Sequence, residues 1–111
     1  MKSETAFLKS IIDSINQIEV YTSVGRDVFM ETTVWQDAVV KRLENIGEAV
    51  KHLSKSTRNR HPEIPWERVG GMRDRLIHDY LEVDFKIVWG VTQRDLPPLK
   101  SAVEDILAWI G

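Results

Sequence analysis

The sequence contains no cysteine among its 111 residues. This absence excludes disulfide bonds, thiolate metal sites and cysteine nucleophiles together. No apolar run approaches the roughly 18 residues needed to cross a bilayer, and residues 1–4 lack the apolar core of a signal peptide. We therefore expect a protein of the reducing cytoplasm that makes no contact with a membrane.

Histidine is scarce, and its spacing is uninformative for metals. The three histidines, His52, His61 and His78, show no HExxH-type pairing. We accordingly expect neither a metal site nor a bound cofactor.

Strand-like alternation is also missing, because apolar residues recur at helical spacing along almost the whole chain. A hydrophobic fraction of 42% and a charged fraction of 29% suit a globular protein rather than a disordered one. The length allows one domain, residues 1–111, and is too short for two. The pattern predicts an all-α fold, an antiparallel bundle of four to five helices.

The expected helices cover residues 3–23, 33–53, 65–80, 84–93 and 95–110, with a short helical turn at 28–31. Thr33 and Gln36 form the pattern of a capping box, Pro65 suits a first helical position, and Asp84 suits a cap. Residues 95–98 are expected to restart the chain into the last helix. The side chains expected to face the core are Leu8, Ile11, Ile15, Ile18, Val39, Leu43, Ile46, Val50, Leu53, Leu99, Val103, Ile106 and Ile110.

The net charge of −2 hides an uneven distribution. Residues 51–75 carry seven basic and three acidic side chains, net +4, whereas the segments on either side are each net −3. We call residues 54–63 within this stretch the basic connector. Such a segment could follow a phosphate backbone, although a solvated helix end explains the charge equally well. The side chains predicted to bind RNA are Lys51, Lys55, Arg58, Arg60 and Arg75.

The helix expected at 65–80 holds the residues that could carry chemistry. Arg73 falls within its apolar stripe, where an unpaired charge is costly, while Asp74 and His78 are spaced to interact on the opposite side. The adjacent Gly70 and Gly71 indicate a kink or a close approach by another backbone. An ideal helix separates Arg73 from His78 by about 140°. A two-fold dimer along this helix would bring two histidines and two arginines into one cleft.

Those groups suit RNA cleavage without metal. One imidazole could remove the proton of the ribose 2′-hydroxyl as it attacks the phosphate, and another could protonate the leaving oxygen. An arginine could bind the phosphate as negative charge develops. On the residues alone, however, a structural surface of arginine, aspartate and histidine is the commoner arrangement.

The string Arg73-Asp74-x3-His78-x-Tyr80 resembles the signature of HEPN ribonucleases, in the form found in HepT toxins. Three further segments resemble parts of HepT-like proteins in the same order: residues 46–49, 64–66 and 95–99. The similarity thus covers nearly the whole chain.

The resemblance implies a homodimeric helical bundle that cleaves RNA without metal at the dimer interface. Carried over by position, Arg73 and His78 are catalytic and Asp74 orients the site. Tyr80 matches the tyrosine that a cognate nucleotidyltransferase antitoxin of the MntA type modifies with AMP. An anionic nucleotide there would block RNA by bulk and by charge.

Two other functions remain open at this stage. The chain could be a non-catalytic helical binding subunit of a nucleotidyltransferase, which needs no catalytic histidine. It could also be a purely structural bundle in which Arg73 and His78 hold a dimer together. Neither the RNA that is cut nor its base preference can be inferred from the sequence.

Overall fold

The computed structural model describes residues 4–72, 74 and 83–110. Every regular element in these ranges is a helix, which confirms the predicted all-α class. In chain order they are α1 (Glu4–Thr22), α2 (Arg26–Glu31), α3 (Thr33–Lys51), α4 (Lys55–Arg58), α5 (Trp66–Gly70), α7 (Phe85–Gly90), the π-helix η2 (Val91–Asp95) and α8 (Leu96–Ile110).

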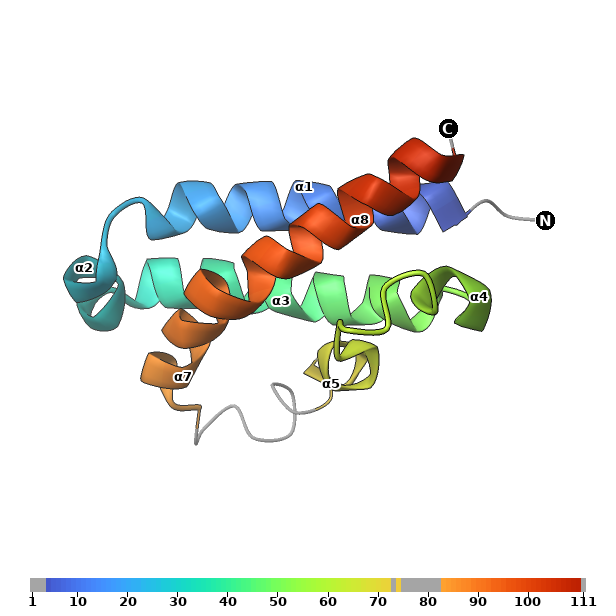
Figure 1. Ribbon diagram of the computed structural model, residues 1–111. Coiled ribbons are helices and arrows are strands. Elements are labelled where there is room, and N and C mark those ends of the chain that lie inside the picture. The colour runs from blue at the N-terminus through green and yellow to red at the C-terminus, as the bar shows by residue number, and fades with distance from the viewer. Residues whose placement is uncertain (1–3, 73, 75–82, 111) are drawn as a thin grey trace.

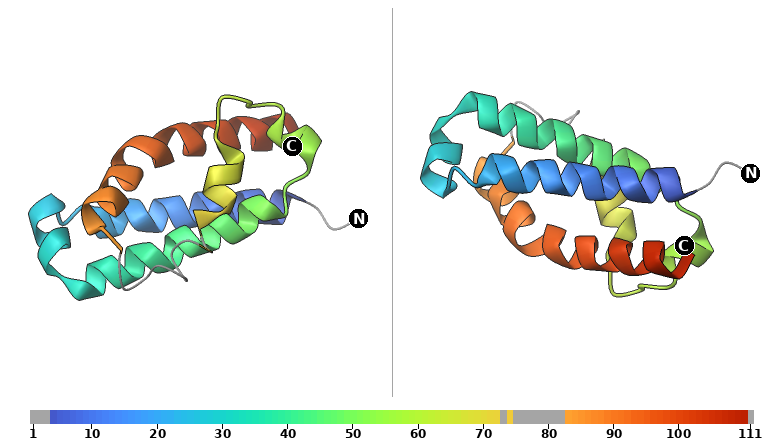
Figure 2. Two further views of the ribbon diagram at one scale, coloured as in Figure 1. Left: turned by 90° about the horizontal axis from the view of Figure 1, so that it is seen from below. Right: turned by 90° about the horizontal axis from the view of Figure 1, so that it is seen from above.

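Three long helices, α1, α3 and α8, form the body of the molecule (Figure 1). The chain reverses through α2, so α3 runs antiparallel to α1, and α8 crosses in front of both. α1 packs against α3 and α8, whereas the short α5 packs on α3. Figure 2 shows α5 lying across the direction of the long helices, between α3 and the basic connector.

The core consists of the apolar stripes that the sequence pattern predicts. Leu8, Ile11, Leu43, Ile46 and Val103 are at most 1% exposed. Among the described residues, the twelve largest fully buried side chains come from α1, α2, α3 and α8. Helical packing of one apolar face against another therefore accounts for the fold.

The C-terminal end of α8 departs from the prediction. Ile110 was expected to face the core but is 43% exposed, while Ile106, one turn earlier, is fully buried. The inward stripe of α8 ends at Ile106 because the helix reaches the edge of the bundle, so its last turn has no core to cover.

The expected capping box at Thr33 is wrong. The N-cap of α3 is Thr32, and its side chain makes no capping hydrogen bond. Gln36 instead donates from Nε2 to the carbonyl oxygens of Phe29 and Met30, both at 3.1 Å. These are carbonyls in the last turn of α2, where the helix leaves carbonyl groups unsatisfied. The backbone N–H of Thr32 also donates to the Phe29 carbonyl, at 3.4 Å.

The expected restart at residues 95–98 is also wrong. Gly90, Val91 and Leu96 all have helical backbone angles, so α7 continues through η2 into α8. Pro97 and Pro98 directly follow η2, whose wider turn ends with the Leu96 N–H donating to the carbonyl oxygen of Val91. Asp84 does cap this helix as predicted, its side chain accepting from the backbone N–H of Lys86 at 2.9 Å.

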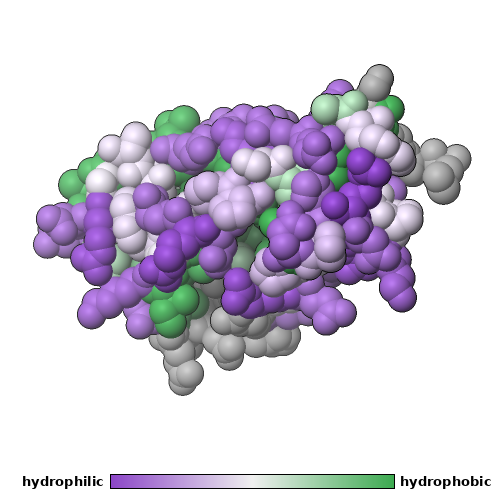
Figure 3. All heavy atoms as spheres, viewed as in Figure 1, coloured by the Kyte–Doolittle hydropathy of each residue, from purple (hydrophilic) through white to green (hydrophobic). Residues whose placement is uncertain are grey.

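The face of the molecule in Figure 3 is largely hydrophilic, with apolar surface in small separate areas. None of the helices within the described ranges is both long and apolar enough to span a membrane.

Candidate functional site

Four residues of the predicted site lie outside the described residues: the catalytic pair Arg73 and His78, the RNA-binding Arg75 and the expected AMP acceptor Tyr80. The described residues on either side of this segment are anchored. Met72 before it and Val83 after it are partly buried and pack against the hydrophobic core. The two ends of the segment are therefore fixed on the bundle.

The glycine pair marks the end of a helix that packs on α3, and the nearest α3 backbone atom to an added Cβ at Gly70 would be the Gly47 carbonyl oxygen, at 4.0 Å. The helix α5 ends at Gly70, and Gly71 is its C-cap, so the helical run is interrupted just before Arg73. Gly70 also lies close to α3: an added Cβ would be 3.5 Å from side-chain carbons of Val50 and Lys51. The start of the predicted catalytic segment is thus packed directly on α3.

Asp74 is the one described residue within the predicted catalytic string. Its carboxylate accepts a hydrogen bond from the Lys51 ammonium at 3.2 Å. The two side chains are 58% and 38% exposed, so the pair adds at most about 1 kcal/mol to stability. Lys51, predicted to bind RNA, therefore holds Asp74 against the end of α3 in this structure.

The basic connector begins with a capped turn of helix. The Ser54 hydroxyl accepts from the backbone N–H of Thr57 at 3.1 Å, which starts α4. Glu4, in the first turn of α1, accepts from Ser54 N–H and from the Thr57 hydroxyl. Burial acts to raise the pKa of Glu4, but these hydrogen bonds outweigh it and hold the pKa below its usual value. The carboxylate fixes α4 to the start of α1.

The end of the connector is fixed to α8. His61 lies between two carboxylates, with Nδ1 2.8 Å from Glu63 and Nε2 2.7 Å from Asp105. These hydrogen bonds raise the pKa of His61 above its ordinary value. Next to it, the Arg60 guanidinium lies 3.8 Å from the centre of the Trp109 ring, a cation–π contact. Both ring nitrogens of His61 are occupied, so it is poorly placed to contact a phosphate.

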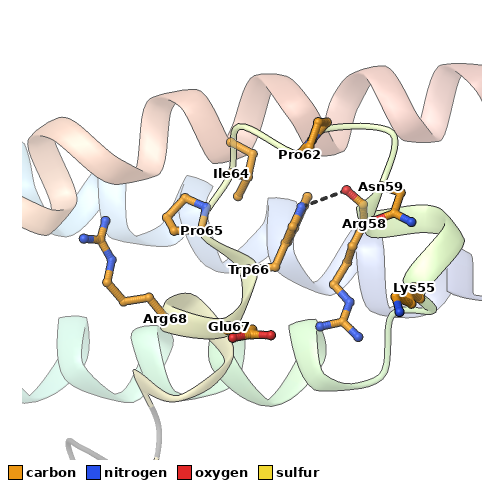
Figure 4. Close-up of a pocket in the computed structure, with 9 residues that line it drawn as sticks. All are labelled: Lys55, Arg58, Asn59, Pro62, Ile64, Pro65, Trp66, Glu67 and Arg68. Atoms are coloured by element: carbon orange, nitrogen blue, oxygen red, sulfur yellow. Dashed lines mark hydrogen bonds between the residues drawn. The ribbon is translucent and has the colours of Figure 1, made fainter.

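Between these two anchors the connector and α5 line an open hollow of about 580 Å³ (Figure 4). Trp66 forms its floor, and its indole N–H donates to the carbonyl oxygens of Arg58 and His61, at 3.0 and 2.9 Å. The residues lining the hollow are Lys55, Arg58, Asn59, Pro62, Ile64, Pro65, Trp66, Glu67 and Arg68. Its wall combines three cations and one acid with an apolar side.

The structure thus separates the cations predicted as one RNA-binding group. Lys55 and Arg58 line the hollow, Lys51 pairs with Asp74, and Arg60 covers Trp109. Sequence analysis missed Arg68, which joins the hollow from α5. Arg68 is one of the seven basic residues counted in residues 51–75. Which group each of these cations contacts depends on the tertiary structure, which the spacing in the sequence does not show.

Within the described residues no three histidine, aspartate or glutamate side chains gather closely enough to hold a metal ion. The functional groups in this part of the chain are the cations that line the hollow and the hydrogen-bonded imidazole of His61. The hollow itself has one apolar wall.

Comparison with known proteins identifies the family. A family model described as "Ribonuclease HepT-like" matches residues 11–106. "Putative RNase TTE0752" of Caldanaerobacter subterraneus subsp. tengcongensis is 37% identical over 108 residues, 96% of each chain. "Probable ribonuclease HepT" of Thermococcus cleftensis is 37% identical over 106 residues, 95% of this chain and 96% of the relative.

A third relative is longer. "Gamma-glutamylcyclotransferase and putative RNase MJ0434" of Methanocaldococcus jannaschii is 39% identical over 107 residues, which is 96% of this chain but 48% of that protein. No solved structure matches the chain significantly. The family match extends from α1 into α8 and includes both the connector and the Arg73–Tyr80 string, so the chain belongs to the HepT-like ribonuclease family.

Proposed function

We propose that the protein is an endoribonuclease that cleaves RNA by attack of a ribose 2′-hydroxyl on the neighbouring phosphate, without a metal ion. His78 accepts the hydroxyl proton as the new O–P bond forms. The bond to the 5′ oxygen breaks, and that oxygen leaves with a proton from an imidazolium. The products are a strand ending in 2′,3′-cyclic phosphate and a strand beginning with a 5′-hydroxyl.

Arg73 binds the phosphate oxygens in this proposal. Its guanidinium is always charged and presents several donors in a plane, which suits a phosphate gaining negative charge. Asp74 orients the site, and its contact with Lys51 is compatible with that role, because the ion pair fixes the position of the residue next to Arg73.

The observation that carries the proposal is the Arg73-Asp74-x3-His78-x-Tyr80 string inside a family match covering residues 11–106. Relatives that align over nearly their whole length are named as ribonucleases. The anchoring of Met72 and Val83 on the core supports it further, since a catalytic segment needs fixed ends.

We also propose how the protein assembles and how its activity is controlled. Two copies of the chain pair along the segment that holds Arg73 and His78 and form a composite site. The protein is the toxin of a toxin–antitoxin pair in the cytoplasm, and a cognate nucleotidyltransferase silences it by transferring AMP to Tyr80. The added phosphate would repel RNA from the cleft.

The test is expression of the wild type, Arg73→Ala and His78→Ala, followed by growth measurement and analysis of total RNA. Growth arrest with fragments ending in cyclic phosphate is expected only for the wild type. Full cleavage by a folded His78→Ala protein would overturn the proposal.

If the wild type is inactive, its intact mass distinguishes a silenced enzyme from a non-catalytic binding subunit. An AMP-sized addition at Tyr80 identifies a silenced enzyme. An unmodified chain that binds a nucleotidyltransferase without cutting RNA identifies a non-catalytic binding subunit instead.

A further inference from the structure

The hollow beside α5 has the size and charge of a site for an anionic ligand. Its volume of about 580 Å³ falls in the range typical of ligand sites, roughly 300–1,000 Å³. Lys55, Arg58 and Arg68 line it together with Glu67, so its lining carries more positive than negative charge. Arg68 also lies 3.7 Å from the Asp95 carboxylate, an exposed ion pair that an RNA phosphate would have to replace. The apolar side offers a surface against which a ribose or a base edge can lie.

Arg58 is the cation with unused hydrogen-bonding capacity. Its Nε is shielded from solvent and has no hydrogen-bond partner among the described residues. A buried donor without an acceptor is unfavourable, and a bound ion that shifts the side chain is one way to satisfy it. Figure 4 shows the Arg58 side chain extended beside Trp66, on the side of the hollow opposite Arg68.

Two other cations of the same charged stretch are engaged elsewhere. Arg60 is held over the Trp109 ring on α8, and Lys51 is paired with Asp74. Neither lines the hollow. A ligand of the hollow would therefore depend on Arg58 and not on Arg60, although the two residues carry the same charge and lie two positions apart.

The hollow is also close to the predicted cleavage segment. Glu67 and Arg68 lie on α5, and the chain leads from there directly to Asp74, six residues beyond Arg68. Even a fully extended chain of six residues spans no more than about 22 Å. A strand of RNA can cover that distance with a few nucleotides.

We propose that this hollow holds a stretch of single-stranded RNA backbone outside the scissile bond, with Arg58 and Arg68 contacting different phosphates from opposite sides and Lys55 assisting from the same helix as Arg58. The inference rests on the proposed function for its substrate class. The hollow positions the strand, while Arg73 and His78 carry out the cleavage. Glu67 opposes binding and limits it.

Binding of a fluorescein-labelled single-stranded RNA of mixed sequence tests the proposal, measured by anisotropy at several salt concentrations. All proteins carry His78→Ala so that the RNA stays intact. Arg58→Gln is expected to weaken binding on the order of tenfold and to lower the salt slope by about 0.7, the value for one phosphate contact on a single strand. Lys55→Gln, at an exposed position without risk to folding, should weaken binding less.

The matched control is Arg60→Gln, which removes the same charge from the same connector and should leave affinity nearly unchanged. Glu67→Gln should tighten binding. Thermal unfolding of each variant verifies that the fold persists. Equal losses of affinity for Arg58→Gln and Arg60→Gln would indicate nonspecific electrostatic attraction and overturn the proposed site. Failure of the His78→Ala parent protein to bind RNA would also overturn it.

The two proposals fail in different ways. If the wild type cleaves RNA and the Arg58, Lys55 and Glu67 variants bind like the parent, the hollow is not a binding site and the enzyme proposal stands. If the wild type never cleaves but the expected order of affinities holds, the hollow binds RNA in a protein without ribonuclease activity.

Discussion

Gln36 joins two helices through a single side chain. Its amide donates to two carbonyl oxygens at the end of α2, those of Phe29 and Met30, while its own backbone belongs to the first turn of α3. The sequence offered Thr33 and Gln36 as a capping box, and only the contacts show that Gln36 serves the preceding helix. The identity of a polar side chain thus predicts that it will bond, but not to which element.

Gln36→Ala is expected to lower the free energy of unfolding by about 1–2 kcal/mol. Two partly buried hydrogen bonds are lost, each contributing about 1 kcal/mol, although the Phe29 carbonyl keeps a longer bond from Thr32 N–H. Thr33→Ala is the control: the Thr33 side chain is exposed, and alanine is the better helix former. Urea unfolding of both variants checks this. A larger loss of stability for Thr33→Ala than for Gln36→Ala would indicate that Thr33 caps α3 after all.

His61 makes the stability of the connector depend on pH. Its hydrogen bonds to Glu63 and Asp105 raise its pKa above the ordinary value of 6.5. The protonated form is therefore favoured by folding, and its stabilising effect is complete below pH 6.5 and lost as the pH rises through the folded pKa.

The melting temperature of the wild type should exceed that of His61→Gln at pH 5.5, and the difference should shrink by pH 8.5. Comparing the two proteins at each pH cancels the titration of groups elsewhere in the chain. A difference that grew with pH would show that His61 is buried as a neutral ring instead.

At the scale of the elements, apolar periodicity predicts the long helices well. The stripes of α1 and α3 are buried as expected, because a helix face needs only a partner face to cover it. The junction between α7 and α8 was not predictable in the same way. Two prolines indicate a break, yet the chain passes through η2 without leaving helical angles.

The hollow likewise required tertiary contacts, since Arg58 and Arg68 come from different elements. The predicted catalytic string, by contrast, came from the sequence alone. Its residues lie close together in the sequence, so the string can be recognised without knowledge of the three-dimensional structure. What the fold contributes is the anchoring at Gly70, Met72 and Val83, and the pairing of Lys51 with Asp74.

Two isoleucines on α8 test where the core ends. Ile106→Ala should destabilise the protein by about 2–5 kcal/mol, because Ile106 is fully buried and its loss leaves a cavity. Ile110→Ala should change stability by no more than about 0.5 kcal/mol, since the side chain is 43% exposed. Denaturant unfolding measures both. Comparable losses would mean that Ile110 is covered in solution.

At the scale of the whole molecule, the long helices form a frame, and α4 and α5 are packed against it (Figure 1). Contacts from α1, α3 and α8, at Glu4, Lys51 and Asp105, hold the connector and Asp74 against the frame. A frame of this kind can present the same face to a second copy, which the composite site proposed above requires.

Mixing two inactive chains tests that composite site. In a mixed dimer of Arg73→Ala with His78→Ala, one arginine and one histidine remain, contributed by different copies. If the cleft is shared across a two-fold axis, co-expression should restore part of the cleavage that each variant lacks alone. If each chain holds a complete site, no mixed dimer has one, and cleavage stays absent. Native mass measurement of differently tagged chains verifies that mixed dimers form, so that inactivity in their presence would contradict a shared cleft in which one arginine and one histidine from different copies suffice.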